Sequence, residues 1–177
     1  ASQLQEVDIA DLLGRDEITP VEELLHQDID GQTILVTGAG GSIGSELCRE
    51  ILSNSPKLLV LLELNEFSLY HAERRFRSLS SIPIVPCLGS VQDSELLKHL
   101  LHDHKVNTVY HAAAYKHVPL VEENPLQGLR NNALGTQSLI EKCIEAEVNS
   151  FVLISTDKAV RPTNVMGASK RIAEMIV

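Results

Sequence analysis

The sequence predicts an α/β fold in which a doubly wound parallel sheet is covered by helices on both faces. Short β-rich or apolar runs alternate with amphipathic segments from residue 32 onward, which is the pattern of successive strand–helix–strand units. A glycine-rich turn follows the first run. The second run, KLLVLLE at Lys57–Glu63, is apolar almost throughout, as in a strand buried on both faces. In a parallel sheet of this kind, ligands bind where the carboxyl ends of the strands meet.

Each strand is predicted from its composition, and each helix from apolar residues that recur on one face. The first strand is the β-rich TILVT run, and the helix after it places Ile43, Leu47 and Ile51 on one side. The predicted strands are Thr33–Thr37, Lys57–Glu63, Ile82–Leu88, Val106–His111 and Ser150–Ser155. The later helices are predicted at Phe67–Leu79, Asp93–His102, residues 126–146 and Pro162–Val177.

Length and composition indicate one globular domain behind an N-terminal arm. The chain has 177 residues, about the length of one domain. Residues 1–30 are polar and acidic, with a short helix predicted after Pro20, and are interpreted as an arm or linker. Residues 31–177 form the predicted domain, which is truncated after about five strands. Because this fold usually continues into a sixth strand and a substrate lobe, we expect a piece of a longer protein. It should be inactive alone, with apolar surface exposed beside its last strand and helix.

The charge balance and residue usage exclude several classes of function. A formal net charge of -9 repels nucleic-acid phosphates, and three Phe, three Tyr and no Trp offer little surface for base stacking. No apolar run approaches the roughly 20 residues that span a bilayer, so this segment is not expected to contact a membrane. Three widely spaced cysteines indicate reduced thiols in the cytoplasm. His99, His102 and His104 are interpreted as a solvated helix end, and no bound metal is expected.

The glycine-rich turn has the features of a dinucleotide-binding motif. It follows a predicted strand and opens a predicted helix, so free backbone N–H groups at the helix N-terminus face the phosphates. Gly38 permits a tight turn, Gly41 lets the backbone approach a pyrophosphate, and Gly44 lets helix and strand pack closely. A plain flexible loop is the alternative. The cofactor-binding residues predicted here are Gly38, Gly40, Gly41, Ser42, Ile43 and Gly44.

An acidic side chain ends the second predicted strand, about 20 residues beyond the glycine motif. Glu63 at this position accepts hydrogen bonds from the adenosine ribose hydroxyls and repels a 2′-phosphate. No Arg or Lys that would clamp such a phosphate follows before Arg74. We therefore predict that residues 31–177 are an NAD-binding Rossmann domain, with NAD preferred to NADP as the cofactor. An ordinary solvated acid at a strand end is the alternative.

Small residues end the fourth predicted strand. Ala112, Ala113 and Ala114 let the backbone pass close to a flat cofactor, although they suit a plain core equally well. Lys116 and His117 follow at the rim and are weak candidates for substrate contact.

The end of the fifth strand and the last helix carry the most informative residues, Ser155-Thr156-Asp157-Lys158 and Met166-Gly167-Ala168-Ser169-Lys170. The first group lies where ligands of open α/β sheets bind. Met166 and Lys170 are four residues apart and therefore share one helix face. The alternatives are a capped turn with a surface ion pair, and a methionine that only fills the core.

Together these motifs resemble the extended short-chain dehydrogenase/reductase family. The glycine pattern, the alanine-rich end of the fourth strand and Asn132 in the helix after it all match. The segments HAAAYKHVPLVEENP, STDKAVRPTNVMGASKR and DLLGR are similar, more narrowly, to the bacterial polysaccharide-biosynthesis group of nucleotide-sugar 4,6-dehydratases. Enzymes of that group act on UDP-N-acetylglucosamine or a near relative. The resemblance covers about residues 8–177.

The resemblance implies a role for each matching residue. Thr156 matches the position that hydrogen-bonds the C4 hydroxyl, and Asp157 matches the acid that protonates the departing C6 hydroxyl. Lys158 stands where other dehydratases place a Glu base at C5. Lys170 matches the lysine that holds the nicotinamide ribose, and Asn132 is placed on the cofactor side. A lysine acts as a base only when its pKa is lowered, which desolvation or a second cation would do.

Two positions depart from the usual family pattern. The family tyrosine is replaced by Met166, as in the large membrane-anchored subgroup, and methionine cannot shuttle a proton. Thr156 and Asp157, acting through water, are the expected route for deprotonating the C4 hydroxyl. Ser90, followed by Val91, stands where the family has an acid that reads the adenine amino group. A serine still forms a hydrogen bond there, with weaker cofactor affinity expected.

The sequence therefore predicts an NAD-dependent lyase, a UDP-N-acetylglucosamine 4,6-dehydratase or close relative in bacterial surface polysaccharide biosynthesis. The alternatives are a 4-epimerase or reductase on the same fold, and a non-catalytic dinucleotide sensor. Met166 is unfavourable for a tyrosine-dependent mechanism, whereas Asp157 and Lys158 supply the acid and base that elimination needs. The resemblance implies a UDP-sugar substrate and a homo-oligomer. It also implies a parent anchored to the bacterial inner membrane by segments before residue 1, with this domain on the cytoplasmic face.

Overall fold

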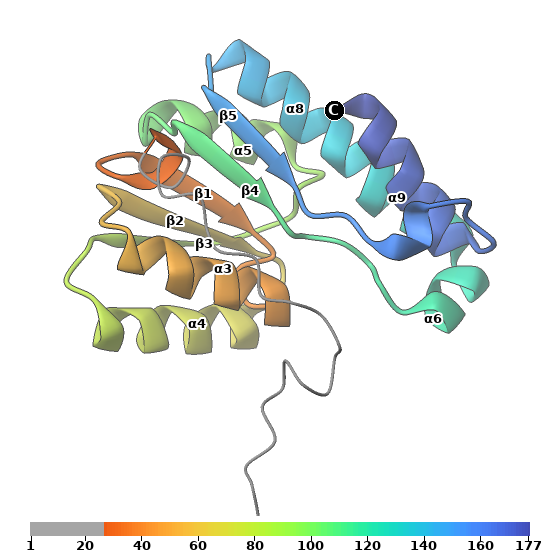
Figure 1. Cartoon of the computed structure of the whole chain (residues 1–177), viewed down its shortest axis with the longest axis horizontal. Coiled ribbons are helices and arrows are strands. Elements are labelled where there is room, and N and C mark those ends of the chain that lie inside the picture. The colour runs from red at the N-terminus through yellow and green to blue at the C-terminus, as the bar shows by residue number, and fades with distance from the viewer. Residues whose placement is uncertain (1–26) are drawn as a thin grey trace, which may run out of the picture.

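Five parallel strands form a single sheet in the computed structural model, which describes residues 27–177 (Figure 1). The strands stand in the order β3-β2-β1-β4-β5, so β1 is central and the chain winds outward from it in both directions. The doubly wound parallel arrangement predicted from the sequence is confirmed. The strands are β1 Thr33–Thr37, β2 Leu58–Glu63, β3 Ile84–Leu88, β4 Thr108–His111 and β5 Ser150–Leu153.

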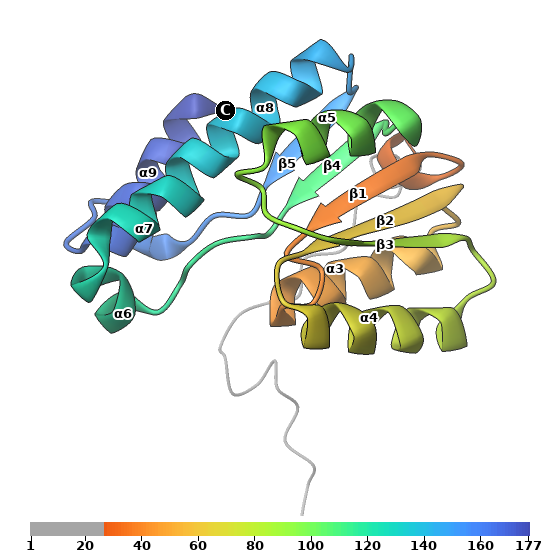
Figure 2. The same ribbon diagram turned by 180° about the vertical axis from the view of Figure 1, so that it is seen from behind.

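Helices cover both faces of the sheet, as Figures 1 and 2 show from opposite sides. One face carries α3 Ser42–Ser53 and α4 Glu66–Leu79, and the other carries α5 Ser94–Asp103 and α8 Gly135–Glu145. The last helix, α9 Val165–Ile176, runs beside α8. Two short helices, α6 Val118–Glu123 and α7 Pro125–Leu129, lie beyond the carboxyl end of β4. Six residues are too few to show a helical period, which is why the sequence did not predict α6.

The core consists of two apolar layers, one on each face of the sheet, because successive strand residues point to opposite faces. On β1, Ile34 and Val36 pack with residues of α3 and α4, whereas Leu35 packs with residues of α5 and α8. Phe76 of α4 and Leu139 of α8 are fully buried, one in each layer. Because β1 is buried along its whole length, the turn that follows it starts from a fixed position.

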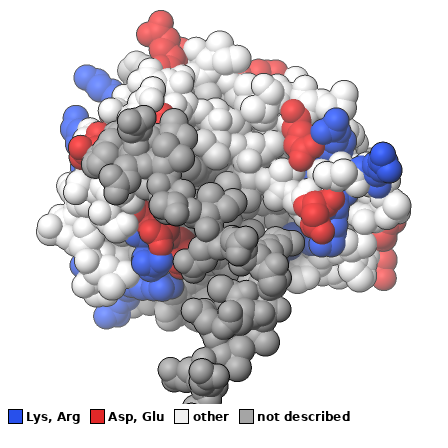
Figure 3. Space-filling view, viewed as in Figure 1, with Lys and Arg blue, Asp and Glu red and all other residues white. Residues whose placement is uncertain are grey.

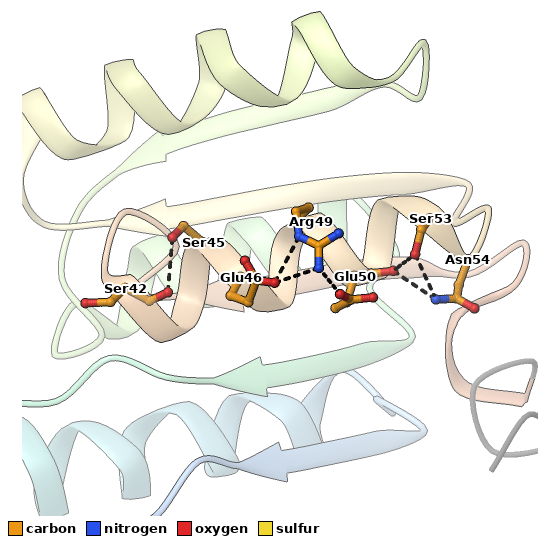
Figure 4. Close-up of polar contacts among 7 residues, drawn as sticks. All are labelled: Ser42, Ser45, Glu46, Arg49, Glu50, Ser53 and Asn54. Carbon is orange, nitrogen blue, oxygen red and sulfur yellow. Dashed lines mark hydrogen bonds and ion pairs between the residues drawn. The ribbon is translucent and has the colours of Figure 1, made fainter. Parts of the chain in front are cut away.

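The solvent-facing side of α3 carries a row of polar contacts directed away from the sheet (Figure 4). Arg49 donates hydrogen bonds to Glu46 at 2.9 and 2.7 Å and also to Glu50. Beyond the helix end, Asn54 Nδ2 donates to the Glu50 carbonyl at 2.9 Å. These exposed contacts add little to stability. The helix is fixed mainly by its inner face, where Cys48 is fully buried.

The long helix predicted over residues 126–146 is present, but it contains a π-helical turn. Residues Arg130–Leu134 form this turn, η1, between α7 and α8, and the backbone stays helical at both junctions. A π turn adds one residue to the helical repeat and occurs frequently at functional sites. Asn131 and Asn132 lie in this turn, and both are buried.

The fifth strand is shorter than predicted, and the last helix begins later. β5 ends at Leu153, two residues early, and Asp157–Ala159 form a 3-10 turn, η2. The last helix, α9, begins three residues later than predicted because Asn164 caps it. The Asn164 side chain accepts a hydrogen bond from Gly167 N at 2.7 Å, which is a typical N-cap arrangement.

The described residues before β1 contact the amino-terminal ends of β4 and β5, at the edge of the sheet opposite to the one where the strands have their carboxyl ends. The Asp28 carbonyl accepts a hydrogen bond from Thr108 Oγ1 at 2.9 Å, and its carboxylate accepts one from Ser150 Oγ at 2.7 Å. Ile29 is buried in the layer that faces α3 and α4. The helix predicted after Pro20 lies outside the described residues.

The apolar surface expected beside the last strand and helix is present. Val152 of β5 and Ile172 and Met175 of α9 are exposed. Within residues 27–177, no helix is long and apolar enough to cross a membrane.

Candidate active site

The glycine-rich turn between β1 and α3 lies against the end of β4, the neighbour of β1 in the sheet. Gly38 has a φ of +68°, and a Cβ built there would lie 2.8 Å from both Cα and N of Ala113. A Cβ on Gly44 would lie 2.0 Å from the carbonyl oxygen of Gly38. No side chain fits at such distances, so both positions require glycine. The tight turn expected at Gly38 and the close packing expected at Gly44 are both present.

A cleft of about 420 Å³ opens at the carboxyl ends of β1, β2 and β4. Its volume lies in the range of small-molecule binding sites. The predicted residues that line it are Gly38, Gly40, Gly41, Ser42, Ile43, Gly44, Glu63, Ser90, Val91, Ala112, Ala113, Ala114 and Lys116. The structure adds Asn65, Tyr115 and Asn131, which the sequence analysis did not single out.

Two backbone N–H groups fix the Glu63 carboxylate at the edge of the cleft. Glu63 Oε2 accepts a hydrogen bond from Gly40 N at 3.0 Å, and Oε1 accepts one from Asn65 N at 3.0 Å. Each carboxylate oxygen keeps a free lone pair for a ligand hydroxyl. The glycine turn and the end of β2 are thereby joined through the side chain that was predicted to bind ribose.

Ser90 lies on the cleft wall that follows β3. Its Oγ accepts a hydrogen bond from Gln92 N at 3.1 Å, which leaves the hydroxyl proton for an acceptor on a ligand. An ionised acid at this position would only accept hydrogen bonds, whereas Ser90 can also donate one to a ring nitrogen.

Asn132 does not line the cleft, because protein groups occupy its whole amide. Its Oδ1 accepts hydrogen bonds from Tyr115 N at 2.8 Å and from Asn131 Nδ2 at 3.1 Å. Its Nδ2 donates to Tyr115 O and to Ser169 Oγ, both at 3.0 Å. Two donors and two lone pairs are thus in use, and none remains for a cofactor. The π turn presents the adjacent Asn131 to the cleft, a shift that a 3.6-residue pattern does not reveal.

His111, the last residue of β4, is buried beneath this region. Its Nδ1 lies 2.6 Å from Thr37 Oγ1, and its Nε2 lies 2.9 Å from Thr136 Oγ1. Burial, followed by the positive charge of nearby Lys170, lowers the pKa of His111 to about 3. The ring is therefore neutral at physiological pH. The sequence analysis missed this residue because one histidine in a strand carries no distinguishing pattern.

Thr156, Asp157 and Lys158 lie together in the short turn after β5. The Thr156 hydroxyl donates to Asp157 Oδ1 at 3.0 Å, and Lys158 Nζ lies 3.7 Å from the same oxygen. The hydrogen bond from Thr156, and then the charge of Lys158, lower the pKa of Asp157, whose side chain is 89% exposed. Basic and acidic side chains gather on this side of the molecule, at the right of Figure 3. The three predicted catalytic side chains therefore form one contiguous, accessible group.

Met166 and Lys170 lie on the inner face of α9, and both are buried. Lys170 Nζ donates to the Ile154 carbonyl at 2.6 Å, just beyond β5. Burial lowers the pKa of Lys170, and Glu174 opposes this effect. A Cβ on Gly167 would lie 2.2 Å from the Lys158 carbonyl, so α9 and the turn after β5 are in close contact. This group lies at the end of β5, outside the cleft lining.

A second hollow of about 600 Å³ adjoins the cleft, between the end of β4 and helices α6 and α7. Lys116 lines both spaces, and His117 lines only the second one. The other residues around the second hollow are Ala114, Tyr115, Leu120, Val121, Asn124, Gln127 and Gly128. The two weak substrate candidates are thus brought together at its rim.

The histidines near the end of α5 contact an acid on the same helix. His99 Nδ1 lies 4.0 Å from Asp103 Oδ2, and His102 Nδ1 lies 3.4 Å from Asp103 Oδ1. Among residues 27–177, no group of three or more His, Cys, Asp or Glu side chains is placed to hold a metal ion. Cys48, Cys87 and Cys143 are free thiols.

The central β1, the glycine turn that follows it and the buried lysine of α9 define a Rossmann domain of the extended short-chain dehydrogenase/reductase class. The chain belongs to the polysaccharide biosynthesis protein family, whose sequence profile matches residues 34–177. The family resemblance noted from the sequence motifs is thus confirmed.

Three curated relatives show the range of activities among similar proteins. The capsular polysaccharide biosynthesis protein CapD of Staphylococcus aureus is 47% identical over 178 residues, which cover 99% of this chain and 30% of CapD. A UDP-N-acetylglucosamine 4,6-dehydratase (inverting) of Campylobacter jejuni is 33% identical over 82% of this chain and 42% of its own. A UDP-glucose 4-epimerase of Rickettsia rickettsii is 30% identical over the same shares. This chain therefore spans less than half the length of these relatives.

Solved structures share the fold. Pen from Bacillus thuringiensis superposes with a TM-score of 0.79 and 27% identity, over 85% of this chain and 46% of Pen. DesIV, a dTDP-glucose 4,6-dehydratase from Streptomyces venezuelae solved with NAD bound, has a TM-score of 0.72 and 23% identity. That match covers 81% of this chain and 50% of DesIV.

Gly38→Ala is expected to lower the free energy of unfolding by about 2–4 kcal/mol, because it adds a steric clash to the left-handed φ. Gly31→Ala is the matched control, since Gly31 has a φ of +66° with no atom within 4 Å of a built Cβ. It should cost only about 1 kcal/mol. Urea unfolding followed by circular dichroism measures both variants. Equal losses would show that the contact with Ala113 adds nothing to the cost of the backbone conformation.

Stability is expected to fall as the pH is lowered from 7 to 5, because of His111. The unfolded ring binds a proton below its ordinary pKa of 6.5, whereas the folded ring stays neutral down to about pH 3. The unfolded state binds more protons in this window, so acid favours unfolding by about 1.4 kcal/mol per pH unit. At pH 5 the loss amounts to about 2 kcal/mol. Urea unfolding at pH 7, 6 and 5 measures the slope. His111→Gln should flatten it, and an unchanged slope would assign the effect to other groups.

Proposed function

We propose that the protein containing this chain is an NAD-dependent nucleotide-sugar 4,6-dehydratase that acts on UDP-N-acetylglucosamine or a close relative. The observation that carries the proposal is the accessible Thr156-Asp157-Lys158 group, in contact with the helix that bears Lys170. Elimination of water across C5 and C6 needs an acid and a base on one side of the sugar, and this group supplies both. The similarity to CapD and to the Campylobacter dehydratase supports the reaction and its place in bacterial polysaccharide biosynthesis.

The cleft fits a dinucleotide in three respects. Gly38 and Gly44 allow the backbone to approach a pyrophosphate, and Ala113 places only a small side chain at the end of β4. Glu63 is held by two N–H groups with lone pairs left for ribose hydroxyls, and its charge disfavours the 2′-phosphate of NADP. When bound, NAD would accept a hydride from C4 of the sugar and return it to C6. Lys170 would hold the nicotinamide ribose with N–H groups that Ile154 does not use.

The side chains after β5 can pass one proton through the reaction. Asp157 is ionised in the open structure, since its pKa is lowered, so it can take the C4 hydroxyl proton through Thr156. Lys158 removes the C5 proton only as the neutral amine, after the covering sugar has desolvated it and its own proton has left to solvent. A proton exchanged with solvent would return from Lys158 to C5 once the hydride has reached C6. A sugar that covers this turn excludes water and raises the pKa of Asp157, which then returns its proton to the departing C6 hydroxyl as water forms. Met166 has no exchangeable proton, so this route replaces a tyrosine.

An epimerase and a non-catalytic sensor are the alternative functions. The similarity to the Rickettsia 4-epimerase favours the first, because that enzyme shares 30% of aligned residues. An epimerase of this fold needs no acid–base pair at C5 and C6, so the Asp157–Lys158 pair favours elimination. A sensor would have no need of Asp157, Lys158 or Lys170, and all three are present.

We also propose how the larger protein is organised. Residues 1–30 are an arm, and residues 31–177 are the cofactor-binding domain. The sugar-binding lobe follows residue 177, and the chains assemble into a homo-oligomer. The protein is anchored at the bacterial inner membrane with this domain on the cytoplasmic side. The similarity to relatives more than twice as long supports the additional lobe.

The reaction is tested by proton NMR on the full protein, with UDP-N-acetylglucosamine in deuterated water and no added cofactor. A C6 methyl signal with deuterium at C5 is expected, because the base exchanges the C5 proton with solvent. Inversion at C4 without a methyl signal would indicate the epimerase. Absence of any change, with NAD shown to bind, would mean a different sugar or the sensor.

Asp157→Asn in the same protein is expected to reduce dehydration by about 100-fold or more, because it removes the proton carrier. NAD binding should be unchanged, since Asp157 lies outside the cleft. Asp103→Asn, at an exposed acid of α5, is the matched control and should keep full turnover. Dehydration at the wild-type rate in Asp157→Asn would remove Asp157 from the mechanism.

A further inference from the structure

A buried histidine between two threonines links the main elements of the site. The His111 side chain is fully inaccessible, and each ring nitrogen contacts one hydroxyl. Nδ1 lies 2.6 Å from Thr37 Oγ1 on β1, and Nε2 lies 2.9 Å from Thr136 Oγ1 on α8. Both threonines are buried as well. None of these three residues lines the cleft, so their hydrogen bonds connect parts of the protein and are not made to a ligand.

The partners of the two threonines determine the direction of each hydrogen bond. The Thr136 hydroxyl lies 2.7 Å from the Asn132 carbonyl, which can only accept, so Thr136 donates there. Thr136 Oγ1 must then accept from His111, which places the ring proton on Nε2. The Ala113 amide can only donate, and it lies 3.3 Å from Thr37 Oγ1. The Thr37 hydroxyl proton is therefore directed to Nδ1.

A protonated ring would disrupt this chain of bonds. Nδ1 would become a second donor to Thr37 Oγ1, and the Thr37 hydroxyl proton would lose its acceptor. The nearby Lys170 cation would also repel the ring. One tautomer of the neutral ring satisfies every group, from the Ala113 amide through His111 to the Asn132 carbonyl.

The chain of bonds joins the glycine turn to α9, the helix that carries Lys170. Thr37 directly precedes Gly38, the residue that contacts the end of β4. At the other end, the Asn132 side chain accepts from the Tyr115 N–H and donates to the Tyr115 carbonyl. It also donates to Ser169 Oγ on α9. The cleft wall and the Lys170 helix are thus connected through buried, uncharged groups.

We propose that His111, as the neutral Nε2–H tautomer, is a positioning residue that holds the Gly38 turn and the π turn in register. It acts through Thr37 and Thr136 and touches no ligand. The expected effect of His111 on NAD affinity rests on the proposed function, because its measurement requires that NAD binds. The tautomer and the backbone positions can be measured without any ligand.

The experiment measures the ring by long-range ¹H–¹⁵N NMR in the whole chain and the Gly38 and Ala113 amides in the same sample. The expected result is a protonated Nε2 and an unprotonated Nδ1. Thr136→Val removes the acceptor and should shift the Gly38 and Ala113 amides and weaken NAD binding by about tenfold. Thr136→Ser restores the hydroxyl and should restore both. Leu139→Val, a buried change in the same helix, should leave them unchanged.

Each outcome decides the proposal. A proton on Nδ1, or a charged ring at pH 7, would overturn it even if Thr136→Val did not fold. Unmoved Gly38 and Ala113 amides in folded Thr136→Val would refute the positioning role. An absence of NAD binding in the wild-type chain would count against the proposed function alone, because the ring and amide measurements would still stand.

Discussion

The first turn after β1 and the end of β4 approach so closely that no Cβ fits between Gly38 and Ala113. Parallel pairing imposes this approach, because β1 and β4 are neighbours and their last residues, Thr37 and His111, lie opposite each other. The chain leaves β1 toward α3 on one face and leaves β4 toward the other, so a crevice opens where the two strands end. Glycine and alanine then make the wall of that crevice largely from backbone. A ligand there meets N–H groups fixed by the sheet.

The polar side chains of Asn132 and His111, beneath this wall, are uncharged and form hydrogen bonds to other protein groups. Among the described residues, no buried side-chain nitrogen or oxygen lacks a hydrogen-bond partner. Asn132 uses its whole amide, and His111 stays neutral between two hydroxyls. A buried network in which every group is paired is rigid, because moving one member leaves another unpaired at a cost of about 1–3 kcal/mol. The charged Asp157 and Lys158 lie outside this interior, on the accessible turn after β5.

The sequence was sufficient for the fold and for most of the cleft, because both depend on local patterns. Buried parallel strands are apolar runs, and the glycine turn and Glu63 stand at fixed positions relative to strand ends. Features set by tertiary contacts were not predictable in this way. A 3.6-residue period does not reveal the π turn, in which Asn131 and not Asn132 lines the cleft. His111 and its two partners come from three separate elements, so no spacing along the chain reveals them.

With Met166 at the position of the family tyrosine, the proposed mechanism gives the neighbouring Lys170 a different role. In a tyrosine-dependent site, a lysine cation promotes ionisation of the phenol, but Met166 has no proton to lose. Lys170 is buried and donates to the Ile154 carbonyl, which leaves two of its three N–H groups for a ligand. In the proposed mechanism, proton transfer falls to the exposed Asp157 and Lys158, on the other side of the contact at Gly167. The proposed roles of the two lysines match their burial, since the buried Lys170 would hold the cofactor and the half-exposed Lys158 would react with the sugar.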